Sequence, residues 1–165
     1  MSLSHLSQIP TPITPDSGTR VWLELQWDDQ AISSITFTTQ QNPLATDLLP
    51  TKWLEVFERY WDRPLSKATQ SALMALPVHL VGTYYQQRIW SELRQIPSGQ
   101  TTSYGAISTQ LTSSPRAVAG ACRANPIVLV VPCHRVVSKN GLGGFMGATQ
   151  GDSVDIKRWL LNHEQ

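Results

Sequence analysis

An uninterrupted apolar run, Ile127 to Val131, constrains the fold of this chain more than any other stretch. A run of β-branched and apolar residues of this length is typical of a buried strand. Asn125-Pro126 stops the helix predicted before it, because the residue preceding a proline is driven out of the helical region. Cys133 stands where the run ends, between Pro132 and His134, so the chain fixes one thiol at the edge of its core.

The overall composition excludes several classes of protein. The 165 residues can form one domain or two small ones, and 13 basic against 12 acidic residues leave a formal net charge of +1. That charge creates no global field for unspecific nucleic-acid binding, so any contact with DNA must be local. No apolar run approaches the roughly 20 residues that span a bilayer, and the amino terminus lacks a signal-peptide pattern. We therefore expect a cytoplasmic protein without membrane contact.

The two cysteines, Cys122 and Cys133, are too few for a disulfide framework in a chain of this size. A reducing cytosol keeps both as thiols. Cys122 is expected to be a small packed side chain, which leaves Cys133 as the candidate for chemistry.

The amino-terminal half is predicted to be a small α+β unit. Residues 1–18 are rich in Ser, Thr and Pro without apolar periodicity, which indicates an irregular lead-in. Residues 21–27 and 32–38 alternate apolar and polar side chains, which predicts an antiparallel pair of strands. Aromatic and apolar residues recur at helical spacing over residues 50–61, with Thr51 as a candidate cap, and this helix would cover the strands.

The carboxyl-terminal half is predicted to be mostly helical. Thr83 is a candidate cap for the first helix, and Ser114-Pro115 supplies a cap followed by a proline in the first turn of the third. The second and third helices are joined by a tight turn, which is the arrangement of a DNA-binding helix-turn-helix. The predicted helices cover residues 84–93, 104–111, 115–123 and 155–164.

Cys133 and His134 form a candidate nucleophile and base. A free cysteine has a pKa of about 8.5, so a nucleophile at neutral pH needs a base or a positive field. Neighbouring residues on an extended chain point in opposite directions, so His134 can serve only if the fold turns it toward the thiol. An acid such as Glu164 could then orient the imidazole.

Many ordered segments of this chain resemble the O6-alkylguanine-DNA alkyltransferase family, also called methylated-DNA–protein-cysteine methyltransferases. The resemblance runs from about Gly82 to the carboxyl end, and it is much weaker before that. The segments that carry it are Gln87-Arg88-Ile89-Trp90, Ile96-Pro97-Ser98-Gly99, Thr102-Ser103-Tyr104-Gly105, Arg116-Ala117-Val118, Asn125-Pro126, Pro132-Cys133-His134-Arg135-Val136 and Trp159-Leu160-Leu161-Asn162-His163-Glu164.

The resemblance implies direct reversal of DNA damage. Cys133 would take an alkyl group from O6 of guanine, irreversibly and once per molecule. His134 would accept the thiol proton through a water, and Glu164 would hold the imidazole. Asn125 would bridge the helix-turn-helix to the cysteine segment, and Tyr104 would hydrogen-bond the flipped guanine and crowd its phosphate.

The resemblance also implies how DNA is bound. The second helix of the helix-turn-helix would enter the minor groove, where reading is nearly blind to sequence. Arg116 would fill the space left by the flipped base, since a base inside a duplex cannot reach the thiol. The small side chains of Ala117 and Ala119 would let the helix approach the duplex, as would that of Ala121, and Arg123 would contact phosphates.

The base pocket is where the sequence departs from the family. The main-chain carbonyls of Cys133 and Val136 would accept guanine amino protons, and the loop at Phe145, Met146 and Gly147 would close the pocket. The family's usual Gly-Tyr-Ser-Gly-Gly type of loop is here Gly144-Phe145-Met146-Gly147-Ala148, with a longer link to the last helix. The range of alkyl groups accepted therefore stays open.

The fold class expected is α+β, with a ribonuclease H-like α/β domain over residues 1–80 and a winged helix-turn-helix-like domain over residues 81–165. The partner expected is double-stranded DNA containing O6-alkylguanine. We expect a monomer without cofactor and without metal, because the first half has His5 and His79 but no cysteine to complete a zinc site. Cooperative binding to DNA stays open.

Three other functions compete with this interpretation. A binding module that flags damaged bases without repairing them would have its reactive cysteine replaced, whereas Cys133 is present. A cysteine hydrolase would need an oxyanion site and would leave Arg116, Tyr104 and the helix-turn-helix unexplained. A transcription regulator would leave Cys133, His134 and Glu164 unexplained.

Overall fold

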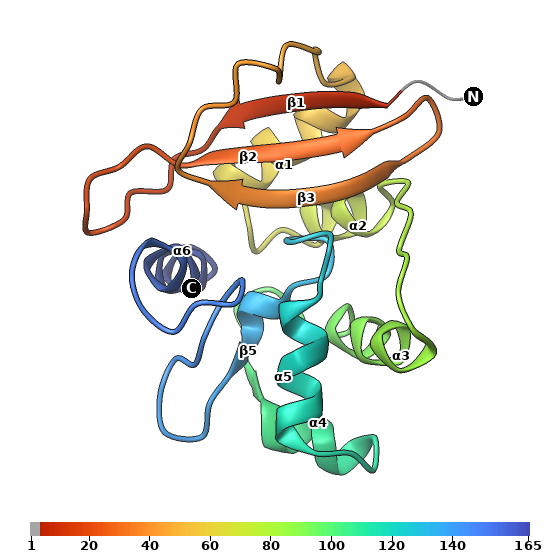
Figure 1. Ribbon diagram of the computed structural model, residues 1–165, viewed down its shortest axis with the longest axis vertical. Coiled ribbons are helices and arrows are strands. Elements are labelled where there is room, and N and C mark those ends of the chain that lie inside the picture. The colour runs from red at the N-terminus through yellow and green to blue at the C-terminus, as the bar shows by residue number, and fades with distance from the viewer. Residues whose placement is uncertain (1–3) are drawn as a thin grey trace.

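The computed structural model of the protein describes residues 4–165, and a three-stranded antiparallel sheet forms its upper layer in Figure 1. The strands β1 (His5–Pro10), β2 (Trp22–Trp27) and β3 (Ile32–Thr38) lie in the order β1-β2-β3. In β2, Leu23, Leu25 and Trp27 are buried, so the apolar side of the alternating pattern faces the core. The predicted strand pair is confirmed.

Two helices lie against one face of this sheet, behind it in Figure 1. The first, α1 (Thr51–Asp62), buries Trp53, Phe57 and Tyr60 at spacings of four and three residues. The second, α2 (Lys67–Met74), buries Thr69 and Leu73. The predicted cover over the strands is thus confirmed and extended by a second helix.

Two predictions for this half were wrong, and one helix was missed. Part of the expected lead-in, residues 5–10, is strand β1, because its backbone pairs with β2 despite the absence of apolar periodicity. Residues 1–3 of that lead-in lie outside the described residues. Thr51 is not a cap, since Pro50 precedes the helix and no side-chain cap bond forms there. The helix α2 was not predicted at all.

The carboxyl-terminal half begins with three helices whose starts follow from local capping. Thr83 caps α3 (Tyr84–Leu93) in a reciprocal capping box with Gln86. The short strand β4 (Thr102–Ser103) leads into α4 (Tyr104–Gln110), which Ser103 caps. Ser114 caps α5 (Pro115–Arg123), and Pro115 takes the first helical position. The two predicted caps, Thr83 and Ser114, are confirmed, as are the three helices.

The apolar run Ile127 to Val131 is buried as predicted, but it is not a strand. Ile127 makes an isolated bridge to Ile35 of β3, and the chain then turns, with Leu129 at a left-handed φ of 71°. An extended chain would separate Asn125 from Cys133 by roughly 25 Å. The turn instead brings the Asn125 amide within 3.1 Å of the Cys133 sulfur, so the site requires this departure from strand geometry.

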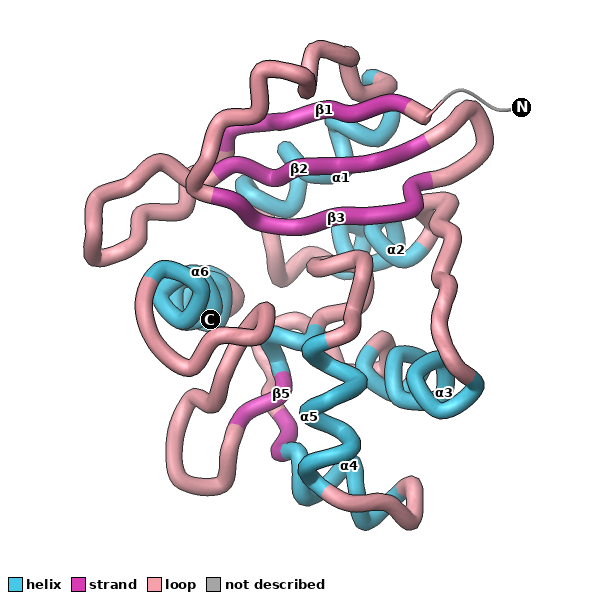
Figure 2. The backbone as a smooth tube through the Cα atoms, viewed as in Figure 1, coloured by secondary structure: helices cyan, strands magenta, loops and turns pink. Residues whose placement is uncertain are grey.

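The chain ends by returning to the cysteine segment. A 3-10 helix (Cys133–Arg135) leads into β5 (Val136–Val137), which pairs in parallel with β4. The last helix, α6 (Asp152–His163), starts three residues before its predicted start and lies between the sheet layer and the helices α3 to α5 (Figure 2). Within residues 4–165, no helix is both long enough and apolar enough to cross a membrane.

Gly99 is a point where the fold constrains the end of α6. Its φ is +80°, and a Cβ there would come within 2.8 Å of the main-chain oxygen of Glu164. Gly18 has a similar φ of +72° with no atom within 4 Å of such a Cβ. A side chain at either position would therefore strain the backbone, but only one at Gly99 would also clash with Glu164.

We expect Gly18→Ala to lower the free energy of unfolding by about 1 kcal/mol, the cost of a left-handed backbone. Gly99→Ala is expected to lower it by about 2–4 kcal/mol, because the clash with Glu164 is added. Urea denaturation of both variants measures the difference. Equal losses of unfolding free energy in the two variants would show that the clash with Glu164 does not contribute to the destabilisation.

Candidate active site

Cys133 lies at the start of the 3-10 helix, with 5% of its surface exposed. Its sulfur accepts a hydrogen bond from Asn125 Nδ2 at 3.1 Å, and the same nitrogen donates to the carbonyl of Val131 at 2.8 Å. Asn125 Oδ1 accepts from the backbone of Ile127. One amide thus ties the end of α5 to the thiol.

The helical turn at Cys133 also directs His134 toward the carboxyl terminus. His134 Nε2 lies 3.0 Å from Glu164 Oε1, and both side chains are 1% exposed. Since a carboxylate only accepts, the proton lies on Nε2 and Nδ1 carries a lone pair. Among the described residues, Nδ1 is buried and has no hydrogen-bond partner. It is therefore free to accept a proton.

The Glu164 carboxylate accepts hydrogen bonds from two residues besides His134. Arg135 donates to both carboxylate oxygens, from Nε to Oε2 and from Nη2 to Oε1, each at 2.8 Å. Tyr60 of α1 donates its hydroxyl proton to Oε1 at 2.7 Å. The buried carboxylate thus accepts hydrogen bonds on both oxygens and pairs with a cation, which is the condition under which a buried charge is tolerated.

The electrostatics keep the thiol and the imidazole neutral at rest. Burial raises the pKa of Cys133, an effect only partly offset by the Asn125 hydrogen bond and by Lys157. Burial lowers the pKa of His134 against the opposing pull of Glu164. Burial alone would raise the pKa of Glu164, but His134 and Arg135 outweigh it and hold this pKa well below its usual range. The site therefore holds a neutral imidazole at His134 beside an ionised carboxylate at Glu164.

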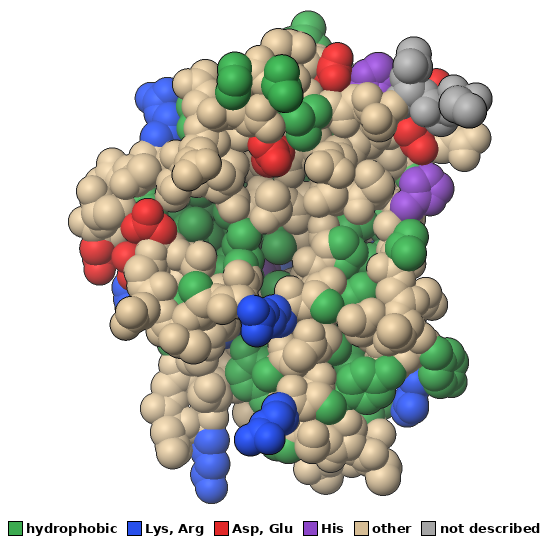
Figure 3. Space-filling model, in the orientation of Figure 1, with side chains coloured by type: hydrophobic (Ala, Val, Ile, Leu, Met, Phe, Trp, Pro, Cys, Tyr) green, Lys and Arg blue, Asp and Glu red, His purple; other side chains and the backbone are tan. Residues whose placement is uncertain are grey.

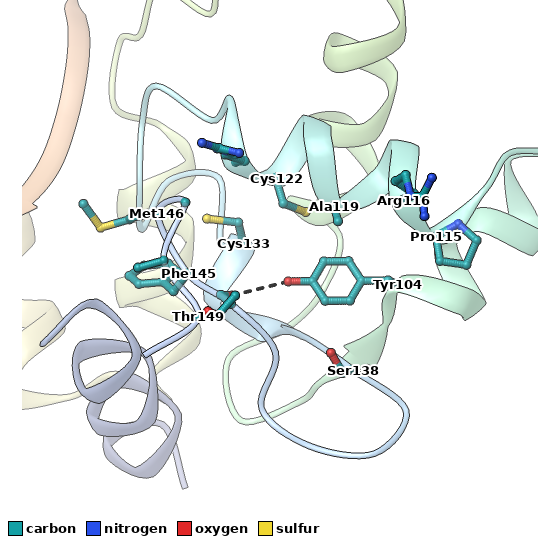
Figure 4. A pocket seen from close by; sticks show the side chains of 14 residues that line it. Tyr104, Pro115, Arg116, Ala119, Cys122, Cys133, Ser138, Phe145, Met146 and Thr149 are labelled. Carbon is teal, nitrogen blue, oxygen red and sulfur yellow. Dashed lines mark hydrogen bonds between the residues drawn. The ribbon is translucent and has the colours of Figure 1, made fainter. Parts of the chain in front are cut away.

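A cavity of about 450 Å³ opens above Cys133. In Figure 4, Cys133 lies between Tyr104 on one side and the Phe145 and Met146 loop on the other. The Tyr104 hydroxyl donates to the Gly144 carbonyl at 3.4 Å. This volume is in the range of small-molecule sites. The remaining lining residues are Pro115, Arg116, Ala119, Cys122, Arg123, Ser138, Gly147, Ala148 and Thr149.

The loop over this cavity is a tight turn. Phe145 and Ala148 exchange backbone hydrogen bonds of 2.9 and 3.0 Å, and the two residues between them, Met146 and Gly147, have φ of 50° and 83°. Two positive φ angles are those of a type I′ turn, which suits glycine and strains Met146. A Cβ on Gly147 would lie 3.2 Å from Arg123 Nε, so α5 packs directly against this turn.

Lys157 of α6 is a buried cation that holds the loop in place. It is fully buried, and its Nζ donates to the carbonyls of Val136 at 2.6 Å and Gly144 at 3.0 Å. Burial lowers its pKa to about 8, against the pull of the two nearby cysteines. The Val136 carbonyl, which was predicted to face a base, therefore already accepts one hydrogen bond, and Val136 itself is buried and is not among the residues that line the cavity.

The helix pair α4 and α5 presents the predicted DNA-binding residues. Arg116, Ala117 and Arg123 are exposed, and Ala119 is half-buried at the cavity. The expectation for Ala121 was wrong, since it is 3% exposed and its carbonyl accepts from Trp90 Nε1. Figure 3 shows only basic charged side chains over the region of α4 and α5 on this face.

Three charged or hydrogen-bonding residues around Cys133 and Glu164 were not predicted as site residues, namely Tyr60, Arg135 and Lys157. Lys157 could have been found, because it shares one helical stripe with the buried Val154 and Leu160 and with Glu164, which was predicted. A charged residue on an apolar stripe indicates a buried, paired group. Arg135 offers no such signal. The contact of Tyr60 depends on packing between distant segments.

Comparison with known proteins gives a consistent result. A family model described as "6-O-methylguanine DNA methyltransferase, DNA binding domain" matches residues 84–165. The Shigella flexneri methylated-DNA–protein-cysteine methyltransferase is 43% identical over 97 residues, which cover 57% of this chain and 54% of that protein. The chain thus spans about half the length of this relative, and the same holds for the Salmonella typhimurium protein of that name.

Other matches extend over nearly the whole chain. The crystal structure of Mycobacterium tuberculosis OGT in complex with DNA has a TM-score of 0.73 and 30% identity, covering 97% of this chain and 92% of that one. The Methanosarcina acetivorans methylated-DNA–protein-cysteine methyltransferase is 33% identical over 147 residues, which cover 85% of this chain and 89% of that protein. On the strength of this full-length similarity, the chain belongs to the methylated-DNA–protein-cysteine methyltransferase family.

Proposed function

We propose that this protein repairs DNA by transferring an alkyl group from O6 of guanine to Cys133, once per molecule. The observation that carries the proposal is the arrangement at Cys133. A buried thiol at the floor of a cavity contacts Asn125, while His134, Glu164 and Arg135 form a paired network behind it. The names of the relatives, and the DNA bound to one of them, support the same conclusion.

The chemistry is an in-line displacement at the alkyl carbon. The thiol proton passes to His134 Nδ1 through a water, and the imidazolium is stabilised by Glu164. The thiolate sulfur attacks the alkyl carbon, so the carbon–sulfur bond forms as the carbon–O6 bond breaks. The guanine leaves with the electron pair and takes up a proton from water, and the imidazolium returns its proton to water. A thioether has no easy exit, so the protein is consumed.

Delivery of the base requires its rotation out of the duplex. Unstacking costs a few kcal/mol, and less for a damaged, weakly paired base. Arg116 fills the vacated space, Tyr104 hydrogen-bonds the flipped guanine, and Ala117 and Ala119 let α5 approach the minor groove. Arg123 contacts phosphate. The exposure of Arg116 and Ala117 and the place of Tyr104 in the cavity wall support these roles.

The guanine lies against the main chain of the cysteine segment. The carbonyls of Cys133 and Val136 accept the amino protons of the base, and a backbone N–H near Met146 donates to O6. Phe145, Met146 and Gly147 close the cavity, which supports their role as the wall that faces the alkyl group.

The proposal includes the organisation of the chain. Residues 1–80 form a ribonuclease H-like domain and residues 81–165 a winged helix-turn-helix-like domain that carries the cysteine. The pairing of α4 with α5 and the short β4–β5 sheet support the second description. The protein acts as a monomer in the cytoplasm on double-stranded DNA containing O6-alkylguanine.

Intact-protein mass spectrometry tests the transfer. After incubation with O6-methylguanine duplex, we expect one methyl increment on the wild type and none on Cys133→Ala. Cys122→Ala is the matched control, because Cys122 lines the same cavity, and it should still gain one methyl. The absence of an increment on the wild type would refute the proposal, and continuous turnover would favour a hydrolase.

Arg116→Ala tests base rotation. Only the duplex requires extrusion, so we expect the variant to repair duplex DNA roughly 10- to 100-fold more slowly, the equivalent of about 1–3 kcal/mol. Transfer from the free O6-methylguanine base should change less than twofold. Arg20→Ala, an exposed arginine outside the helix pair, is the control and should leave both rates unchanged. Equal losses in both assays for Arg116→Ala would remove it from this role.

The pH dependence of transfer tests the state of His134. Only the neutral imidazole can accept the thiol proton, and burial lowers the pKa of His134 below its ordinary value of 6.5. Single-turnover rates at saturating duplex should therefore stay constant from pH 8 to about 6.5 and fall only in more acidic buffer. A fall that begins above pH 7 would contradict a neutral, buried base.

A further inference from the structure

Tyr60 reaches the active site from the opposite half of the chain. It lies on α1, is 1% exposed, and donates its hydroxyl proton to Glu164 Oε1 at 2.7 Å, across 104 residues of sequence. This is the shortest of the hydrogen bonds that Glu164 receives. The site therefore includes the hydroxyl of a residue on α1, the helix that packs against the three-stranded sheet.

The hydroxyl shares its acceptor with the histidine. Glu164 Oε1 also accepts from His134 Nε2 and from Arg135 Nη2, whereas Oε2 accepts from Arg135 Nε. A hydrogen bond donated to a carboxylate oxygen stabilises its charge and makes it a weaker acceptor for other donors. The phenol thus competes with the imidazole for one oxygen, and it tunes how strongly Glu164 raises the basicity of His134.

Packing between α1 and α6 keeps the phenol in place. The ring centroids of Tyr60 and His163 are 5.6 Å apart, and His163 Nε2 lies 3.1 Å from the Tyr60 carbonyl. Trp61 packs edge-on against Trp159, with centroids 6.3 Å apart. Burial and the Glu164 charge raise the pKa of Tyr60 well above its usual value, so the phenol stays a proton donor over the working pH range.

We propose that Tyr60 is a positioning residue for alkyl transfer, whose hydroxyl fixes the Glu164 carboxylate and sets the basicity of His134. The inference rests on the proposed function, since it concerns the base that deprotonates Cys133. It gives the amino-terminal half a part in the chemistry, in addition to packing.

Other titratable and charged groups lie near His134, and a variant that tests Tyr60 must leave these residues unchanged. On its own 3-10 helix this is Arg135, and α6 and its end contribute Lys157 and Glu164. Tyr60→Phe removes one oxygen atom and changes none of these residues. Tyr85→Phe is the matched control, because its hydroxyl bonds Ser113 at 2.6 Å, away from Glu164.

The experiment compares single-turnover methyl transfer from saturating O6-methylguanine duplex between pH 5 and 8. Without the phenol, Glu164 accepts a stronger hydrogen bond from His134 and raises the pKa of this histidine. We therefore expect the acid limb of the Tyr60→Phe profile to move to higher pH by about 0.5–1 pH unit. Tyr85→Phe should leave the limb in place. An unmoved limb, or a uniform loss of rate at every pH, would mean that Tyr60 only packs.

Two further measurements keep the outcome interpretable. Nuclear magnetic resonance titration of the His134 ring should give a higher pKa in Tyr60→Phe than in the wild type, with the exposed ring of His79 as internal comparison. This readout needs no transfer, so it separates failure of this inference from failure of the proposed repair activity. If Tyr60→Phe does not fold, 3-fluorotyrosine at position 60 keeps the ring and strengthens the donor. The limb should then move to lower pH, and an unmoved limb would overturn the inference.

Discussion

The buried carboxylate of Glu164 is the interaction on which the rest of this structure depends. A charge removed from water is costly unless it is paired and hydrogen-bonded, and here the donors are His134, Arg135 and Tyr60. They come from the 3-10 helix and from α1, while the carboxylate follows α6. Three elements must therefore meet at one point, so the site can exist only when both halves of the chain are packed together.

The same kind of burial protects the thiol that we propose as the nucleophile. Cys133 and His134 are both held in their neutral forms by desolvation, and the thiol is 5% exposed. The thiol lines the cavity, whose other walls come from α4, α5 and the turn at Met146. Lys157 fixes that turn from below by two hydrogen bonds to main-chain carbonyls. Reactivity is thus directed toward a ligand that enters between the helix pair and the turn.

Local signals predicted the elements that depend on local interactions. Thr83 and Ser114 cap their helices as expected, because a cap satisfies backbone N–H groups only three residues away. The strand β1 was missed because its stability comes from pairing with β2, and α2 because no cap bond or strong stripe marks it. The run Ile127 to Val131 was correctly predicted to be buried, yet periodicity could not show that it turns.

The sequence by itself determined the chemical groups at the site, since the order of Asn125, Cys133, His134 and Glu164 carries the family resemblance. It also determined which segments are buried, because apolar patterning reflects transfer from water. Only the tertiary structure decided which groups meet. The turn after Asn125, the main-chain partners of Lys157 and the bond from Tyr60 to Glu164 depend on contacts between distant segments. Such contacts arise from the packing of whole elements, and no local pattern encodes them.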